Sequence, residues 1–195
     1  MIEIHDITNT IFTSKTYILS KEGCDKAWLV DIGDVEPVLE YLNVNHLAVE
    51  GIILTHAHFD HIYGLEALVE HYPNCKVYVT EYTKQALASD KLNMSRYHGD
   101  RINYDRDNVV VVHEEESMTL FVDEPQMVFY VTPGHNPGCL TMVMGDVIFT
   151  GDAYIPGVEV NTRLPFADKV LASQSMDLIL KLADGKRMLP GHFVH

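Results

Sequence analysis

Residues 53–61 read Ile53-Leu54-Thr55-His56-Ala57-His58-Phe59-Asp60-His61, so an apolar run leads directly into three histidines and an aspartate. Imidazole nitrogens and carboxylate oxygens are the ligands that zinc and similar divalent ions prefer in proteins. The apolar run has the composition of a short buried strand, and side chains that alternate as the strand opens into a helix can aim at two neighbouring points. We therefore expect His56 and His58 to share one metal ion, and Asp60 and His61 to bind a second.

Three more candidate ligands lie downstream, each directly after a glycine at a predicted strand exit or turn. They are His135 in Thr132-Pro133-Gly134-His135-Asn136-Pro137-Gly138, Asp152 in Phe149-Thr150-Gly151-Asp152, and His192 in Leu189-Pro190-Gly191-His192. Glycine permits close backbone approaches that a β-carbon would obstruct, which suits a ligand held on a rigid loop. Each motif alone is also an ordinary turn sequence, so the metal hypothesis rests on all of them together.

The rest of the chain alternates strand and helix patterns. Periodicity predicts strands at 16–19, 27–32, 51–54, 75–80 and 187–189, and helices at 35–42, 62–72, 82–88 and 169–183. Five successive strands are predicted at 109–113, 118–122, 126–132, 140–144 and 147–150, with Gly145-Asp146 as a tight hairpin turn. Residues 89–107 are polar and predicted to be irregular. No linker or repeat divides the sequence, so we expect a single domain over residues 1–195.

Composition bounds the classes of function. The chain has 195 residues, of which 47% are hydrophobic, enough for a buried core. Its 14 basic and 28 acidic residues give a net charge of −14, which argues against nucleic acids and anionic membranes as partners. No apolar stretch approaches the ~20 residues of a membrane-spanning helix. The sequence has no secretory signal pattern and no CxxC pair, which predicts a cytoplasmic protein with reduced thiols.

Together the seven candidate ligands resemble the metallo-β-lactamase superfamily and match every ligand position of its two-metal hydrolase branch. The resemblance covers almost the whole chain and implies an α/β (α+β) fold, the αββα four-layer sandwich, with two divalent metal ions at one edge between the sheets. It implies that His56, His58 and His135 hold the first ion, that Asp60, His61 and His192 hold the second, and that Asp152 bridges them. Zinc is the expected metal, with iron and manganese as alternatives. Asp31, at a strand end, occupies the place of an acidic residue that supports the ligand loop in this family.

Within the superfamily, the His-x-His-x-Asp-His run and the Pro-Gly-His and Gly-Asp motifs are most similar to those of glyoxalase II-like thioesterases. Cys139 differs, because it stands where glyoxalase II usually has another histidine; we expect it to line the pocket. Only three residues follow His192, so we expect no glutathione-binding C-terminal domain. Tyr154 and Arg163, in the loop after Asp152, are candidate substrate contacts.

These features imply a metal-dependent hydrolase. Two ions ~3.5–4 Å apart lower the pKa of a shared water toward ~7 and polarise the bond under attack, so hydroxide is available without a covalent enzyme intermediate. Asp60 is the catalytic candidate that orients this nucleophile or receives its proton. The expected substrate is a small ester, thioester or lactone. The protein partner that the sequence leaves open is a second copy of the chain, in a homodimer.

Three other functions stay open on the sequence alone. A mononuclear iron oxygenase of the persulfide dioxygenase type uses two histidines and an aspartate from a similar ligand set. A phosphodiesterase or nuclease of the same superfamily is disfavoured by the acidic charge. A metal-binding scaffold without catalysis is disfavoured because all seven ligand positions are filled.

Overall fold

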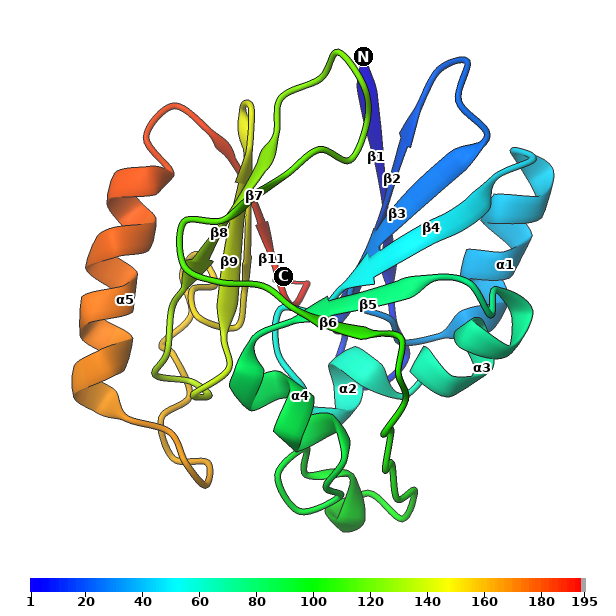
Figure 1. Cartoon of the computed structure of the whole chain (residues 1–195). Coiled ribbons are helices and arrows are strands. Elements are labelled where there is room, and N and C mark those ends of the chain that lie inside the picture. Colours follow the sequence, from blue (N-terminus) through cyan, green and yellow to red (C-terminus); the bar gives the residue numbers. More distant parts are fainter. Residues whose placement is uncertain (194–195) are drawn as a thin grey trace.

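The computed structural model describes residues 1–193, and its centre is a pair of β-sheets that face each other (Figure 1). The first sheet contains, in spatial order, β1 (Ile2–Thr8), β2 (Lys15–Lys21), β3 (Lys26–Val30), β4 (Ala48–Ile53), β5 (Lys76–Val79) and β6 (Val109–Val111). β1 to β3 are antiparallel, whereas β3 to β6 are parallel. Parallel strands end at one edge of a sheet, and the loop that follows β4 opens there.

The second sheet contains, in spatial order, β11 (Arg187–Pro190), β10 (Val147–Gly151), β9 (Leu140–Met144), β8 (Met127–Val131) and β7 (Ser117–Met118). β11 runs parallel to β10, and the other neighbours are antiparallel. The predicted turn at Gly145-Asp146 connects β9 to β10. Gly145 has a φ of +58°, the left-handed conformation that a two-residue hairpin requires.

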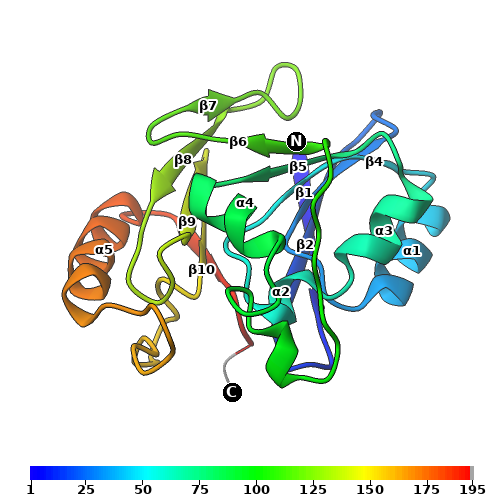
Figure 2. The same ribbon diagram turned by 60° about the horizontal axis from the view of Figure 1, so that its bottom comes forward.

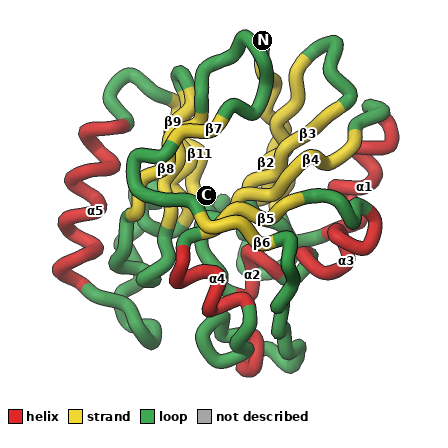
Figure 3. The backbone as a smooth tube through the Cα atoms, in the orientation of Figure 1, coloured by secondary structure: helices red, strands yellow, loops and turns green. Residues whose placement is uncertain are grey.

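Helices cover the outer faces of both sheets, which confirms the predicted four layers (Figures 1 and 3). α1 (Val35–Val44) and α3 (Leu65–His71) lie against the first sheet, and α5 (Lys169–Leu182) lies against the second. α2 (Phe59–Ile62), α4 (Glu81–Leu87) and a short 3₁₀ turn (Ser95–Tyr97) lie at one end of the sheets, which Figure 2 turns toward the reader. In the described residues no helix is long and apolar enough to cross a membrane.

Alternation along the central strands divides the core into layers. Ile18 of β2 and Ile52 of β4 belong to the cluster packed with α1 and α3. Leu19 and Ile53, one residue further along each strand, belong to the cluster between the sheets. Because both faces of the sheet are covered at these positions, apolar residues follow one another there instead of alternating with polar ones. A smaller cluster around Ile148 joins the second sheet to α5.

The observed strands differ from the predicted pattern in three places. Residues 2–8 form an edge strand that was not predicted, because most of their side chains are exposed and their apolar alternation breaks after the fourth residue. In the predicted strand 118–122, Leu120 is buried in a bend, where its carbonyl accepts a hydrogen bond from Trp28 Nε1 at 3.2 Å. Residues 109–111 do not join the strands that follow them but extend the first sheet beside β5.

Candidate metal centre

The seven predicted ligands lie together. Two of them, Asp60 and His61, belong to α2, which Figure 2 labels at the end of the sheets turned toward the reader. The seven ligands come from the loop after β4, from α2, from the loop between β8 and β9, and from the residues that directly follow β10 and β11. Three overlapping groups each bring their ligand atoms within 4.8 Å of one another: His56, His58 and His135; His56, His61 and Asp152; and Asp60, His61 and His192.

Asp152 lies between the first and last of these groups. Its Oδ2 is 3.4 Å from Nε2 of His135 and 3.2 Å from Nε2 of His192. Its Oδ1 is 3.5 Å from Nε2 of His61. Oδ2 of Asp60 is 3.3 Å from His192 Nε2 and 3.4 Å from His61 Nε2, so Asp60 faces the second group. The carboxylate of Asp152 therefore has neighbours in both.

Hydrogen bonds on the outer side of the imidazoles fix which nitrogen faces inward. Nδ1 of His192 is 2.8 Å from the carbonyl oxygen of Phe12, and Nδ1 of His135 is 3.2 Å from that of Asn161. A carbonyl only accepts, so each Nδ1 donates and, in the neutral imidazole, the lone pair lies on Nε2. Such outer partners are characteristic of histidines that bind metal.

Asp31 organises two further histidines from beneath the site. Its carboxylate is 2.8 Å from Nδ1 of His61 and accepts hydrogen bonds from the Thr55 amide and hydroxyl, both at 2.7 Å. The Thr55 hydroxyl is in turn 3.1 Å from Nδ1 of His56. Asp31 is 2% exposed and has a φ of +57°, an uncommon conformation for a residue with a β-carbon. This arrangement supports the predicted role of Asp31 behind the ligand loop.

Asn136 is a site residue that the sequence interpretation missed. It is buried, and its Nδ2 is 3.1 Å from Nε2 of His58 while its Oδ1 accepts the Gly138 amide at 2.8 Å. His58 is thereby turned so that Nδ1 is 2.9 Å from Nε2 of His135. The only available signal was the position of Asn136 directly after a ligand.

Burial keeps the histidines of the first group neutral. It lowers the pKa of His56 well below its ordinary value, and the neighbouring imidazoles of His61 and His58 lower it further. Burial, with His135 adding to it, lowers the pKa of His58 to about 3. The pKa of His135 is lowered too, again chiefly by burial. Neutral imidazoles offer the lone pairs that a metal ion needs.

In the second group, neighbouring charges outweigh the effect of burial on the pKa values. Burial opposes the charge of His61, but the carboxylates of Asp60, Asp152 and Asp31 outweigh it and hold the pKa of His61 well above its ordinary value. Burial would raise the pKa of Asp152, but His61 and His192 lower it well below the usual range. The carboxylate of Asp152 is therefore ionised. Burial opposes the charge of His192, but the hydrogen bond and charge of Asp152 outweigh burial and raise the pKa of His192. Metal binding releases protons from imidazoles that carry them.

Two buried ligand atoms make no hydrogen bond within residues 1–193: Nε2 of His56 and Oδ1 of Asp152. An unpaired buried acceptor costs about 1–3 kcal/mol, and its presence calls for a partner. A divalent ion fits, because both atoms belong to one of the close ligand groups and nitrogen and carboxylate oxygen suit such an ion.

We expect Asp31→Asn to weaken divalent metal binding by about 10–100-fold, the usual effect of losing an outer partner of a ligand. The amide keeps the size of the side chain. Its NH₂ group, however, replaces either the oxygen that accepts from the Thr55 amide or the oxygen that faces the Thr55 hydroxyl and His61 Nδ1. Competition with a chromophoric chelator measures the affinity. Unchanged affinity in a correctly folded variant would contradict the assigned role.

A cavity of about 400 Å³ opens beside the ligands. Its wall includes residues from the irregular stretch 89–107 and from the loop 153–168. The lining consists of Phe12, His58, Phe59, Asp60, Met94, His98, His135, Asp152, Ile155, Val158, Glu159, Val160, Asn161, Leu164 and His192. His98 has no ligand spacing in the sequence, and the structure places it on this wall rather than among the metal ligands.

The three predicted substrate contacts lie outside this lining. Cys139 is 2% exposed and packs in the apolar cluster of Ile148 and α5, so the expectation that it lines the pocket is corrected. Burial raises the pKa of its thiol. Tyr154 packs against the same cluster, and Arg163 borders a neighbouring depression formed by residues 159–164. Tyr154 is only two residues from the ligand Asp152, but its side chain packs against the Ile148 cluster. The Gly-Asp motif alone does not indicate this direction.

Comparison with known proteins agrees with the fold. Residues 14–192 match the family described as the metallo-beta-lactamase superfamily. The chain belongs to this family. Divalent metal binding follows from the family and from the His/Asp groups together.

Among the curated relatives are two proteins named hydroxyacylglutathione hydrolase. The one from Shewanella sp. (strain ANA-3) is 31% identical over 178 residues, which cover 90% of this chain and 60% of the relative. The one from Shewanella oneidensis is 30% identical over 141 residues, which cover 72% of this chain and 48% of the relative. The chain thus spans about half the length of these relatives.

Two solved structures are similar over nearly their whole length. BLEG-1, a B3 metallo-β-lactamase, has a TM-score of 0.86 and 27% identity, and the match covers 100% of this chain and 92% of that one. TTHA1623, solved in a di-iron-bound form, has a TM-score of 0.82 and 27% identity, with 97% and 92% covered.

Proposed function

We propose that this chain is a hydrolase that uses two divalent metal ions to cleave a small ester, thioester or lactone. The observation that carries the proposal is the position of Asp152, whose carboxylate lies within 3.5 Å of histidines of both ligand groups. The relatives named hydroxyacylglutathione hydrolase favour a thioester among these substrates, since their name describes thioester cleavage.

In this proposal His56, His58 and His135 would hold one ion, Asp60, His61 and His192 would hold the second, and Asp152 would contribute to both. Zinc is the proposed metal, and the di-iron form of TTHA1623 makes iron the alternative. When bound, such ions supply positive charge that polarises a carbonyl and lowers the pKa of water toward ~7.

Residues of the chain then position the nucleophilic water and accept its proton. Asp60 lines the cavity, and the hydroxyl of Ser14 donates to its backbone carbonyl at 2.7 Å, which fixes the start of α2. A carboxylate held this way can accept the proton of a nucleophilic water at the cavity floor. Cys139 is buried in an apolar cluster and is not placed to act as a nucleophile in the cavity.

We expect protein purified without added chelator to carry two divalent ions per chain, as measured by plasma mass spectrometry and located by anomalous scattering. Removal of the ions should abolish thioester and ester hydrolysis, and zinc should restore it. One iron per chain together with sulfur-dependent oxygen uptake would instead establish the oxygenase. Two ions without hydrolysis of any ester, thioester or phosphodiester probe would leave the scaffold function.

A further inference from the structure

We propose that the cavity selects substrates whose remote part is apolar and uncharged, with Phe12 and Glu159 as specificity-determining residues. This inference rests on the proposed hydrolase function, because that function places the reacting bond at the ligand end of the cavity. Three observations support it: a group of aromatic side chains in the lining, a group of aliphatic side chains in the lining, and the sign of the charges around them.

The aromatic wall is built from three rings. Phe59 stacks on His98 with ring centroids 4.9 Å apart and planes 4° apart, and Phe12 meets the edge of His98 at 5.3 Å. Phe12 is 59% exposed, although a large apolar side chain gains free energy when buried. Phe12 and Thr13 both adopt left-handed conformations, with φ of +53° and +58°. Consecutive residues in this conformation are costly, and Phe12 is one of the residues that line the cavity.

The aliphatic part of the lining comes from the loop after Asp152. It consists of Ile155, Val158, Val160 and Leu164, and Val158 is 45% exposed. Such aliphatic side chains bind an acyl or alkyl group through the hydrophobic effect and offer nothing to a charged one. With both groups in its lining, the cavity is suited to an apolar chain.

Away from the ligand end, where the proposed ions would add positive charge, the charges of the cavity lining disfavour anions. Within the described lining no residue is lysine or arginine, whereas Glu159 adds an exposed carboxylate near the mouth. Recognition of carboxylate or phosphate groups ordinarily uses arginine or lysine, and a like charge opposes binding. A substrate whose remote part carries carboxylates, as glutathione does, is therefore disfavoured at this wall.

The test uses thioesters of one hexanoyl group on two thiols, neutral N-acetylcysteamine and anionic glutathione. Binding is measured separately, by calorimetry, with the unreactive thioethers S-hexyl-N-acetylcysteamine and S-hexylglutathione. For the holoenzyme we expect both kcat/KM and affinity to favour the neutral compound by about tenfold or more. Because the thioethers do not react, their binding is independent of the proposed reaction.

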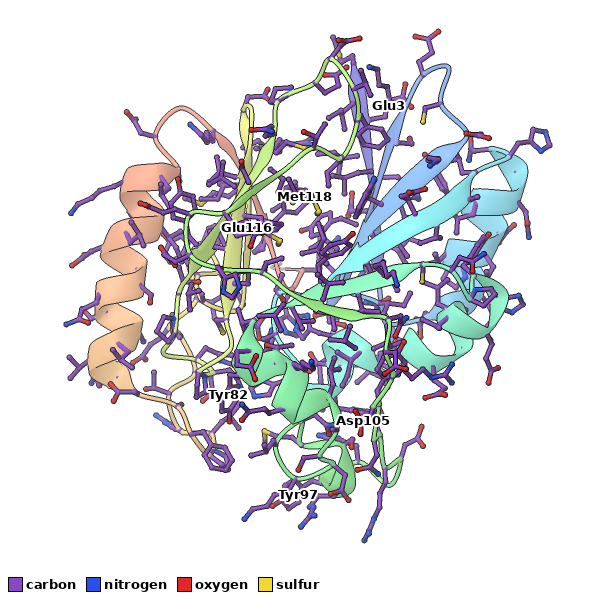
Figure 4. All side chains as sticks on the ribbon, viewed as in Figure 1. Glu3, Tyr82, Tyr97, Asp105, Glu116 and Met118 are labelled. Carbon is purple, nitrogen blue, oxygen red and sulfur yellow. The ribbon has the colours of Figure 1, made fainter. Side chains whose placement is uncertain are left out.

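Charge at the mouth is tested with Glu159→Lys. The ratio of kcat/KM for the two thioesters should shift toward glutathione by about tenfold relative to the wild type, and comparing ratios cancels the different reactivity of the thiols. The matched control is Glu3→Lys, which makes the same charge change on β1 at the opposite end of the first sheet (Figure 4). We expect this control to leave the ratio unchanged.

The aromatic wall is tested with Phe12→Ala. It should lower kcat/KM for the hexanoyl thioester by about tenfold and that for the acetyl thioester of the same thiol by less than about threefold. Tyr97→Ala is the control, since Tyr97 is similarly exposed (62%) and lies in the 89–107 stretch but does not line the cavity (Figure 4).

Preference for the glutathione compounds, lost in Arg163→Ala, would overturn the inference and assign recognition to the neighbouring depression. Equal effects of Phe12→Ala on hexanoyl and acetyl thioesters would overturn the role of the aromatic wall. If the neutral thioether binds preferentially but no thioester or ester is hydrolysed, the proposed reaction fails and the binding preference stands.

Discussion

Asp152→Ala should lower kcat/KM for ester or thioester hydrolysis by at least about 1000-fold, which corresponds to roughly 4 kcal/mol of lost transition-state stabilisation. The carboxylate faces histidines of both ligand groups, so its removal weakens both proposed ion sites at once. Metal content measured on the purified variant should fall below that of the wild type.

Cys139→Ala is the matched control for this result. Its thiol is buried among apolar side chains, so we expect kcat/KM to change less than about twofold and the free energy of unfolding to fall by about 1 kcal/mol. Equal losses of activity from the two substitutions, at normal metal content, would show that Cys139 takes part in the site.

Gly191→Ala should have the second largest effect, although it removes no ligand. A β-carbon on Gly191 would lie 2.1 Å from Oδ1 of Asp152 and 2.9 Å from the backbone carbon of Gly151. The backbone cannot retreat easily, because Gly191 donates to the Gly151 carbonyl at 2.9 Å and accepts from the Lys15 amide at 2.7 Å.

We expect Gly191→Ala to lower metal affinity by about 100-fold and the free energy of unfolding by about 1–3 kcal/mol. Chelator competition and denaturant titration measure the two effects. Gly185→Ala is the control, because φ is +68° there and no atom lies within 4 Å of the added carbon. It should cost about 1–2 kcal/mol of stability from backbone strain and leave metal affinity intact. A Gly191 variant with wild-type affinity would show that Asp152 tolerates displacement.

The layered fold and the gathering of ligands could be predicted because each depends on short-range pattern. Ile52 and Ile53 belong to an apolar run between predicted helices, which indicates a strand covered on both faces. The ligands His56, His58, Asp60 and His61 lie within six positions, so a metal site can be predicted from that short segment alone. Each downstream ligand follows a glycine, and Gly191 has a physical reason to be one, since a β-carbon would displace Asp152.

The parts that could not be predicted depend on contacts between distant segments. His98 and Phe12 lie 86 positions apart, and nothing in either local sequence indicates that their rings meet at the cavity. Asn136 contacts His58 only because two loops converge. Cys139 occupies a ligand-like position in the sequence, but the strand that begins at Leu140 turns it toward α5.

The main-chain carbonyls of Phe12 and Asn161 orient His192 and His135, while the side chains of the same two residues line the cavity. Every amino acid supplies a carbonyl, so exchanging either side chain leaves the orienting hydrogen bond in place as long as the backbone keeps its path. Laboratory evolution of this chain can therefore vary positions 12 and 161 to explore new substrates without first sacrificing the metal site. A single substitution at either position can therefore change the substrate preference while the metal ligands keep their orientation.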